Sequence, residues 1–430
     1  MDYRKTIQQS LDYIEDNLKT EITAAELADM AGFSLYHYYR LFQAATGLPV
    51  MQYILRRRLV HGIYAIHQGS SGIDAALTYG FDTYAGFYKA FLREFACTPS
   101  EYLRFSRAKK PCRLNLFQEA HKIMTHKQIK AVLKYWNLET ETVSDIYYDG
   151  TGTKNENACY VGQNHVLKYS TNLGKLKTHL SLSKEMERIG LWSAAAVPAA
   201  DGRETVQVGD LHFCLTKRLP GQQVEALKLY EGDAAGKARF LGKILGQLHL
   251  ALAQVEACVE EENMLETVTA WALPKAAQVL GLEETACKRY LQTFSALYPQ
   301  LPRQLIHRDP NPGNIICADN TWGFIDFELS QRNVRLFDPC YAATAVLSET
   351  MEHGISMETW LEIYHGILSG YDSVVTLTAE EKQAAPYLVL ANQLICVAWF
   401  AEQEKYAQLL ERNTAMTKWL ADHFEALSLS

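Results

Sequence analysis

Apolar residues recur at helical spacing in two similar segments within the first 105 residues. The first segment is ITAAELADMAGFSLYHYYRLFQAATG, in which two apolar stripes lie on either side of Gly32. Glycine suits a tight turn with positive φ. Thr23, with Glu26 three residues later, is expected to form a capping box, and Ser34 is expected to cap the second helix. The segment therefore predicts two helices that cross closely at a turn.

The same design recurs about 45 residues later in GIDAALTYGFDTYAGFYKAFLREF. Here Gly80 is placed for the turn, Thr83 for the cap, and Phe87 and Phe91 for the core. Between the two segments, VMQYILRRRLVHGIYAIHQ predicts a helix long enough to hold them apart. The first 105 residues are therefore expected to form an all-α domain with two helix-turn-helix units.

After residue 125 the pattern changes to strands followed by helices. VSDIYYDGTGTKNENACYV predicts a strand, a glycine-containing turn and a strand, and HVLKYS predicts the next strand. A helix is expected at about 178–190, and LHFCLTKRLPG predicts a strand that ends in a hinge. Amphipathic helices are expected over 340–430. The stretch 106–124 carries a basic cluster and one proline, and we interpret it as the interdomain connection.

Length and composition favour a soluble chain with several domains. At roughly 100–200 residues per domain, 430 residues predict two or three domains. The 48% hydrophobic and 21% charged residues exclude a largely disordered chain. No apolar run reaches the roughly 18–20 residues that span a bilayer, and the N-terminus does not resemble a secretory signal. We therefore expect a cytoplasmic protein without a membrane partner. The nine cysteines form no CxxC pair, which favours reduced thiols over a disulfide scaffold or a zinc site.

The first 105 residues resemble the DNA-binding domain of AraC-type transcription regulators. The most specific positions are Gly80-Phe81, Phe87, Phe91, Thr98-Pro99, Tyr102 and Arg104. In that family the second helix of each unit enters the major groove, so the resemblance implies double-stranded DNA as a partner. The implied DNA-binding residues are Ser34, Tyr36, Tyr39, Arg40, Tyr84, Tyr88 and Lys89. Arg40 is suited either to reading guanine or to contacting phosphate, and the sequence leaves both open. Ala85 and Gly86 lack long polar side chains, so the first unit is expected to supply more of the specificity.

The strongest chemical signal is LIHRDPNPGNIICADNTWGFIDFE. Phosphoryl transfer needs a carboxylate that orients and deprotonates the attacking hydroxyl, and we assign this role to Asp309. It also needs oxygen ligands for Mg²⁺, for which Asn314 and Asp326 are suited. Asp326 is expected within an apolar strand, GFIDF. A hairpin between Asn314 and Asp326 would bring all three groups to one cleft.

Further parts of a nucleotide site occur upstream in the required order. The expected cofactor-binding residues are Gly150, Gly152, Lys168, Glu185, Lys217 and Leu219. The two glycines allow backbone amides to cover phosphates, and Lys168 is placed to hold the α/β-phosphates. Glu185 is the expected ion-pair partner of Lys168, with Glu187 as the alternative. Adenine is expected to meet backbone groups of the hinge at 217–219.

Together these parts resemble the aminoglycoside phosphotransferase-like kinases, relatives of choline and homoserine kinases, over about 300 residues. The resemblance implies an α+β bilobal protein-kinase-like fold that uses ATP or GTP and Mg²⁺ on small molecules. Glu328 stands where protein kinases have glycine, no Ala-Pro-Glu segment follows, and Asp338 matches an aspartate of the small-molecule kinases. Pro310, directly after the proposed base, departs from the family pattern.

We therefore predict a multidomain chain. The expected parts are an AraC-type double helix-turn-helix domain (1–107), a linker (108–124), a kinase-like N-lobe (125–219) and a helical C-lobe (220–430). The predicted function is a DNA-binding transcriptional regulator whose phosphotransferase-like domain binds Mg-nucleotide and a small-molecule ligand, with or without phosphorylating its hydroxyl. The alternatives are an active antibiotic or metabolite kinase with an autoregulatory DNA-binding domain, and a non-catalytic interaction module, which the retained catalytic residues disfavour. The acceptor, the choice of ATP or GTP and the oligomeric state stay open.

Overall fold

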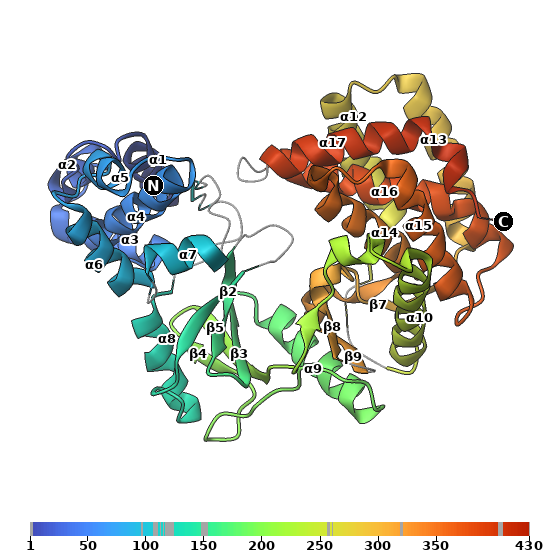
Figure 1. Cartoon of the computed structure of the whole chain (residues 1–430), viewed down its shortest axis with the longest axis horizontal. Coiled ribbons are helices and arrows are strands. Elements are labelled where there is room, and N and C mark those ends of the chain that lie inside the picture. The colour runs from blue at the N-terminus through green and yellow to red at the C-terminus, as the bar shows by residue number, and fades with distance from the viewer. Residues whose placement is uncertain are drawn as a thin grey trace. The chain divides into compact units, whose positions relative to one another are not determined.

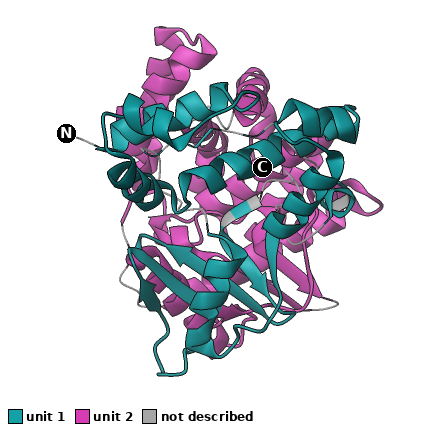
Figure 2. Ribbon diagram, turned by 90° about the vertical axis from the view of Figure 1, so that its left-hand side faces the viewer, with its two compact units in different colours: residues 1–172, 197–215 teal, residues 173–196, 216–430 magenta. Residues whose placement is uncertain are grey.

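The computed structural model describes residues 3–95, 98–105, 111, 113–114, 116, 124–147, 154–255, 259, 261–318, 321–402 and 407–429. The chain divides into two compact units, shown in different colours in Figure 2. Unit 1 comprises residues 1–172 and 197–215, and unit 2 comprises residues 173–196 and 216–430.

Unit 1 begins with the helices of the predicted double helix-turn-helix domain, labelled in Figure 1. They are α1 (Tyr3–Asp16), α2 (Ala24–Met30), α3 (Leu35–Thr46), α4 (Val50–His67), α5 (Gly72–Thr78), α6 (Tyr84–Phe95) and α7 (Pro99–Phe105). Helices α2 and α3 form the first unit of the motif, and α5 and α6 form the second. Gly32 (φ 68°) and Gly80 (φ 79°) take the positive φ that the turns require. The predicted all-α architecture is confirmed.

At one of the predicted helix caps, a tertiary contact replaces a hydrogen bond that the local sequence predicts. The hydroxyls of Thr23, Ser34 and Thr83 each accept a hydrogen bond from the backbone N–H three residues later, at 3.1–3.4 Å. The expected capping box at Thr23 forms only in its first half. The Glu26 carboxylate accepts a hydrogen bond from the Tyr13 hydroxyl (2.7 Å) instead of returning to the cap. A contact with α1 therefore replaces the second half of the capping box.

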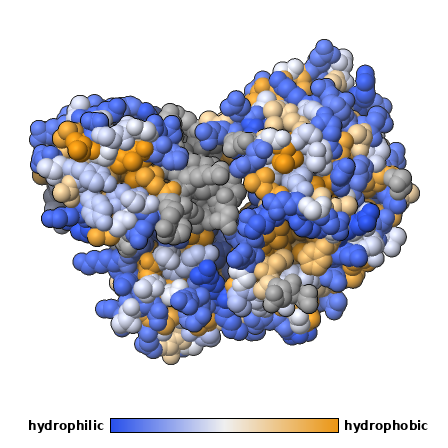
Figure 3. Space-filling view, in the orientation of Figure 1, coloured by the Kyte–Doolittle hydropathy of each residue, from blue (hydrophilic) through white to orange (hydrophobic). Residues whose placement is uncertain are grey.

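The two helix-turn-helix units have separate cores, and α4 contributes to both. Tyr53 and Ile54 lie in the core of the first unit, whereas Leu59 and Ile63 lie in the core of the second. Large apolar side chains also reach the surface of the N-terminal helices, as the orange areas in Figure 3 indicate. Those on α2, α3 and α5 are Met30, Leu35, Tyr36, Tyr39, Ile73 and Leu77.

Three consecutive arginines of α4 bind groups inside the domain. Arg56 pairs with Glu94 of α6 (2.7 Å), and Arg57 pairs with Glu15 of α1. Arg58 donates to two backbone carbonyls in the turn after α1, at 3.0 and 2.6 Å. This basic run therefore connects α4 to α1 and to α6 of the second helix-turn-helix unit.

The rest of unit 1 is a five-stranded sheet with a short helix. The elements are α8 (His126–Leu133), η1 (Lys134–Trp136), β1 (Val143–Tyr147), β2 (Lys154–Val161), β3 (His165–Ser170), β4 (Val206–Val208) and β5 (Leu211–Lys217). The strand order is β1-β2-β3-β5-β4, and the pairs β1–β2, β2–β3 and β4–β5 are antiparallel. The strands predicted from the sequence are present.

Unit 2 is mainly helical. Its α-helices are α9 (Leu173–Arg188), α10 (Ala234–Leu252), α11 (Met264–Thr267), α12 (Leu273–Leu280), α13 (Glu284–Leu297), α14 (Phe337–Thr350), α15 (Met357–Asp372), α16 (Ala379–Ala401) and α17 (Ala407–Asp422). Its short helical turns are η2 (Ala226–Tyr230), η3 (Val268–Ala272), η4 (Tyr298–Gln300), η5 (Pro312–Asn314), η6 (Phe327–Leu329), η7 (Met351–His353) and η9 (Phe424–Leu427). Its strands are β6 (Gln222–Gln223), β7 (Arg303–Ile306), β8 (Ile315–Ala318), β9 (Thr321–Phe324) and β10 (Gln331–Val334), in sheets of order β6-β8-β9 and β10-β7. The predicted hairpin is β8–β9.

Glycines allow α10 and α15 to pack backbone against backbone. A Cβ added at Gly242 of α10 would lie 2.0 Å from the Ile367 carbonyl oxygen, and one at Gly370 of α15 would lie 2.1 Å from the Arg239 carbonyl oxygen. Real Cβ atoms do not approach so closely, so these positions require glycine. The contact also brings His249 of α10 within reach of α15.

One helix among the described residues, α16, is long and apolar enough to cross a membrane by length and composition. Polar residues such as Asn392 and Gln393 interrupt this helix, so the sequence-based expectation that no apolar run reaches roughly 18–20 residues also holds for α16. In addition, 67% of its most apolar window is buried inside the fold, as is usual for a core helix.

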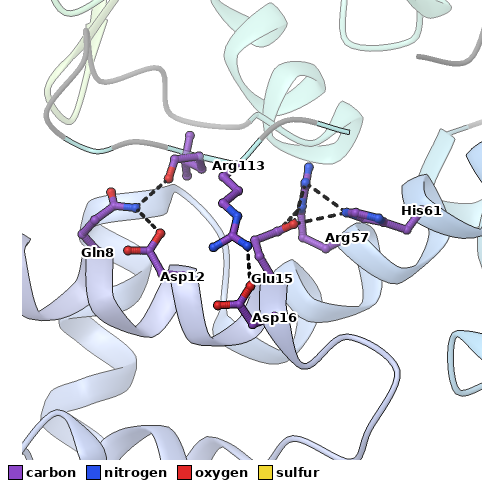
Figure 4. Close-up of polar contacts among 8 residues, drawn as sticks. Gln8, Asp12, Glu15, Asp16, Arg57, His61 and Arg113 are labelled. Atoms are coloured by element: carbon purple, nitrogen blue, oxygen red, sulfur yellow. Dashed lines mark hydrogen bonds and ion pairs between the residues drawn. The ribbon is translucent and has the colours of Figure 1, made fainter. Parts of the chain in front are cut away.

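Glu15 provides a test of how α1 is held to α4 (Figure 4). Burial alone would raise the pKa of Glu15, but hydrogen bonds from His61 and Arg57 and the charge of Arg57 lower the pKa below its usual value. A depressed pKa means that the ionised group stabilises the fold at neutral pH and loses this effect as pH falls through the folded-state pKa. We expect Glu15→Gln to lower the free energy of unfolding at pH 7 by about 3 kcal/mol.

The measurement is thermal melting of wild type and variant across pH. The two melting curves should converge at acidic pH, below the value of about 4.3 for a free glutamate. Asp29→Asn, at an exposed acid of α2, serves as the control and should leave the melting temperature nearly unchanged. A difference for Glu15→Gln that does not vary with pH would contradict the assignment.

Candidate active site and nucleic-acid interface

The segment between β7 and β8 holds Asp309 between two amide side chains. The Asn314 side-chain N–H donates to the backbone oxygen of Asp309 (2.9 Å) and to its Oδ2 (3.2 Å). The Asn311 side-chain N–H donates to Oδ1 of Asp309 (2.9 Å). Because the amide nitrogen of Asn314 faces Asp309, its amide oxygen is the atom suited to a cation.

Asp326 lies close to this loop. The Ile325 N–H donates to the backbone oxygen of Asn314 (3.0 Å), which ties the end of the β8–β9 hairpin to the loop. The expectation that Asp326 lies within a strand is wrong, because β9 ends at Phe324 and Asp326 has a φ of 69°. This left-handed conformation is incompatible with a β-strand.

The environment of Asp309 favours proton uptake. Burial raises the pKa of Asp309, and the negative charge of Asp326 adds to the increase. The hydrogen bonds from the Asn311 and Tyr341 side chains oppose this increase in the pKa. A carboxylate with a raised pKa is a better proton acceptor at neutral pH, provided that it is still ionised.

A buried carboxylate of α14, Asp338, holds the backbone of this loop. Its Oδ2 accepts a hydrogen bond from the His307 N–H (2.8 Å), and its Oδ1 accepts one from the Arg308 N–H (3.0 Å). Oδ2 also lies 2.9 Å from Nε2 of His249, whose Nδ1 is 2.8 Å from the Tyr371 hydroxyl. Arg308 has a φ of 77°, a conformation that costs free energy for a residue with a side chain. The contacts of Asp338 offset this cost.

His307 is a structural hydrogen-bonding group. Its side chain is fully buried, and Nε2 donates to the Ile325 carbonyl oxygen (3.0 Å). Its Nδ1 accepts a hydrogen bond from the Asp309 N–H (3.4 Å). With both ring nitrogens engaged inside the fold, His307 positions Asp309 and Ile325.

The predicted nucleotide-binding residues lie in both units. In unit 1, Lys168 is buried on β3, opposite Ala158 of β2, and Gly150 and Gly152 lie outside the described residues. In unit 2, the Lys217 N–H donates to the Ala195 carbonyl oxygen (3.0 Å). Leu219 belongs to a small apolar cluster beside the hinge. The other members are Ala194, Ile316, Trp192 and Ile325.

The two acids predicted on α9 have partners within unit 2. Glu185 pairs with Arg188 of its own helix (2.6 Å), and Glu187 pairs with Lys217 (3.5 Å). The partnership of Glu185 with Lys168 stays a prediction.

Sequence reasoning missed the role of His179. It lies on the buried face of α9, and its Nδ1 accepts a hydrogen bond from the Phe327 N–H (3.3 Å). Its spacing from Leu176 and Leu180 places it on the apolar stripe of the helix, which is the signal that would have found it.

The predicted DNA-binding residues of the first unit lie at the surface of α3. Tyr36 is 73% exposed, Tyr39 and Arg40 are also exposed, and Ser34 caps the helix. The Arg40 guanidinium lies 6.0 Å from the centre of the Tyr36 ring, one helical turn away. His37 is exposed on the same helix and was not among the predicted residues.

The corresponding residues of α6 are less exposed. Lys89 is exposed, whereas Tyr84 and Tyr88 are half-buried. The Tyr84 ring stacks on Phe87 (6.0 Å between centres) and lies against Gly72 of α5. Tyr84 therefore takes part in packing α5 against α6.

The phosphotransferase enzyme family model matches residues 158–378, half of the chain, and the chain belongs to this family. A helix-turn-helix domain model matches residues 27–104, and the N-terminal part is of the AraC type. Both resemblances inferred from the sequence are thus confirmed.

Two proteins of similar sequence are transcription regulators, and each matches about a quarter of this chain. The uncharacterized HTH-type transcriptional regulator YbfP of Bacillus subtilis (strain 168) is 31% identical over 108 residues, which are 25% of this chain and 37% of that regulator. The HTH-type transcriptional activator AarP of Providencia stuartii is 32% identical over 97 residues, 22% of this chain and 72% of that activator. This chain therefore spans little more than a third of the length of the Bacillus regulator.

The fold of the C-terminal part is similar to that of a solved kinase. The microcompartment-associated aminopropanol kinase aligns with a TM-score of 0.51 and 16% identity, over 70% of this chain and 99% of that kinase. This likeness confirms the predicted kinase-like fold.

Asp338→Asn tests whether the buried carboxylate holds the loop. The change keeps the size of the side chain but replaces one oxygen by an N–H₂ donor, so a backbone N–H of the loop loses its acceptor. We expect the free energy of unfolding of the C-terminal part to fall by about 1–3 kcal/mol in calorimetric melts. Asp422→Asn, at an exposed acid of α17, is the matched control. Equal melting of Asp338→Asn and wild type would contradict this role.

Proposed function

We propose that the C-terminal domain binds a Mg²⁺–nucleotide and transfers its γ-phosphoryl group to the hydroxyl of a small molecule, in a cytoplasmic regulator whose N-terminal domain binds operator DNA. The observation that supports this most is the juxtaposition of Asp309 with Asn314 and Asp326 on a loop held by Asp338. A general base and two oxygen ligands at one place are what phosphoryl transfer requires.

The donor atoms of Asn314 and Asp326 fit Mg²⁺. Both residues offer oxygen, the ligand that Mg²⁺ prefers, and Mg²⁺ is usually held by few protein groups together with phosphates and water. When bound, the ion would neutralise charge on the nucleotide phosphates.

The other proposed roles follow from the chemistry of each group. The Asp309 carboxylate, oriented by Asn311 and Asn314, accepts the proton of the attacking hydroxyl. Lys168 binds phosphate oxygens, and Glu185 is its proposed partner. The nucleotide base, of ATP or GTP, contacts the hinge between Lys217 and Leu219, where the apolar cluster offers a surface for its ring.

A nucleotide sensor without turnover would retain the same metal ligands. However, a sensor needs no general base, and the Asp309 carboxylate is held in a fixed orientation by Asn311 and Asn314, as a group that accepts a proton from substrate requires. This observation favours an active small-molecule kinase joined to a DNA-binding domain over a pure sensor.

Two substitutions separate nucleotide binding from transfer. We expect Asp309→Ala to bind Mg-nucleotide like wild type but to lose phosphoryl transfer by about 10²–10⁴-fold, because only the general base is removed. Asp326→Asn should lose Mg²⁺-dependent nucleotide binding itself.

Binding is measured by titration calorimetry with ATP and GTP. Transfer is measured with a panel of aminoglycosides, macrolides, choline-like amines and amino alcohols, and Asp422→Asn is the control. Equal transfer by Asp309→Ala would reject Asp309 as the base, and unchanged Mg-nucleotide affinity in Asp326→Asn would place the metal elsewhere.

Arg40→Ala tests the DNA-binding role of α3. We expect weaker binding to a duplex selected by the wild-type chain, by about 1–3 kcal/mol if Arg40 reads guanine. If Arg40 contacts phosphate, the loss should be similar on all sequences and the salt dependence should become shallower. Arg289→Ala, at an exposed arginine of α13, removes the same charge and should have no effect. Unchanged affinity in Arg40→Ala would remove this residue from the interface.

A further inference from the structure

Leu114 and Leu116, in the segment that follows α7 in the chain, are bound through their backbone by Gln8 of α1 (Figure 4). The Gln8 side-chain N–H donates to the Leu114 carbonyl oxygen (2.9 Å), and its Oε1 accepts a hydrogen bond from the Leu116 N–H (2.7 Å). One side chain thus satisfies a backbone acceptor and a backbone donor of the segment, in the way a neighbouring strand would. Asp12, one turn along α1, accepts the second N–H of Gln8 (3.0 Å) and orients it.

The segment also contributes to the core of the first helix-turn-helix unit. Leu116 is 5% exposed and belongs to the same buried cluster as Ile7 of α1 and Phe42 of α3, and Leu114 packs against that cluster. Helix α3 carries the predicted DNA-reading residues on its opposite, exposed face. Displacing Leu116 would therefore leave a cavity behind the helix that is proposed to read DNA.

A further contact holds the segment at the end of α1. Arg113 forms an ion pair with Asp16, the last residue of the helix. Both side chains are partly exposed, so this pair orients the segment more than it stabilises it.

Helix α1 passes these contacts on to α4. Glu15 accepts a hydrogen bond from Nη2 of Arg57 at Oε2 (2.9 Å), and Nε2 of His61 lies 3.2 Å from the same oxygen. Helix α4 in turn contributes to the cores of both helix-turn-helix units. Through α1, the segment is connected to α4, the helix that spaces the two helix-turn-helix units.

We propose that Arg113, Leu114 and Leu116 form a regulatory joint of the DNA-binding domain: docked on α1, they hold α3 in its DNA-binding position, and their release lowers affinity for DNA. The phosphotransferase domain follows this segment in the chain, so any state of that domain that favours the released segment would weaken DNA binding. By linkage, DNA binding would favour the docked segment equally. The proposal rests on the proposed DNA-binding function.

The test uses the full chain and compares Gln8→Ala with Gln9→Ala, the same change at an exposed position of the same helix. Docking is measured by hydrogen exchange of the Leu116 amide, and function by affinity for a duplex selected from a random library by the wild-type chain. We expect Gln8→Ala to speed exchange of this amide by about tenfold or more and to weaken DNA binding by about fivefold or more. Gln9→Ala should change neither quantity.

Gln8→Glu keeps the acceptor for the Leu116 N–H but loses the donor to Leu114 and Asp12 and sets a second carboxylate beside Asp12, so it should speed exchange and weaken DNA binding at least as much as Gln8→Ala if it folds as wild type does. This variant keeps the test decisive if Gln8→Ala fails to fold, which melting curves would show. An unprotected Leu116 amide in the wild-type chain would overturn the docking. Faster exchange with unchanged DNA affinity would overturn the coupling. A wild-type chain that selects no duplex would instead overturn the proposed DNA binding and the coupling with it, while exchange would still test the docking.

Discussion

The carboxylate of Asp338 is the interaction on which the candidate active site depends. It is fully buried, and burial of such a group is tolerated only when its oxygens have partners. Those partners are two backbone N–H groups of the loop and the ring of His249. His249 lies on α10, which glycines allow to pack closely against α15. The position of Asp309 therefore depends on helix packing within unit 2.

The N-terminal domain shows a comparable use of buried charge. Helix α4 carries three consecutive arginines, Arg56, Arg57 and Arg58. In the fold, Arg56 and Arg57 pair with Glu94 and Glu15, and Arg58 binds backbone carbonyls. These side chains hold helices together, which leaves Arg40 and Lys89 as exposed cations among the predicted DNA-binding residues.

The sequence predicted those features that depend on local pattern. The helix-turn-helix units, their glycine turns, the β8–β9 hairpin and the spacing of Asp309, Asn314 and Asp326 are all encoded over short distances. What it did not predict depends on contacts between distant residues. The Tyr13 hydroxyl donates a hydrogen bond to the Glu26 carboxylate, and the Phe327 N–H donates one to His179. The Gln8 side chain forms hydrogen bonds with the backbone of Leu114 and Leu116. Asp326 falls outside its expected strand because of a left-handed backbone that the apolar pattern around it does not indicate.

The central claim is that the loop held by Asp338 presents a metal-binding and proton-accepting site to a nucleotide. A crystal structure of the full chain with Mg²⁺ and a non-hydrolysable ATP or GTP analogue tests it most directly. The account predicts that the amide oxygen of Asn314 and the carboxylate of Asp326 coordinate the ion, with the Asp309 carboxylate open toward the terminal phosphate. An ion bound by other residues, or a nucleotide bound away from this loop, would contradict it.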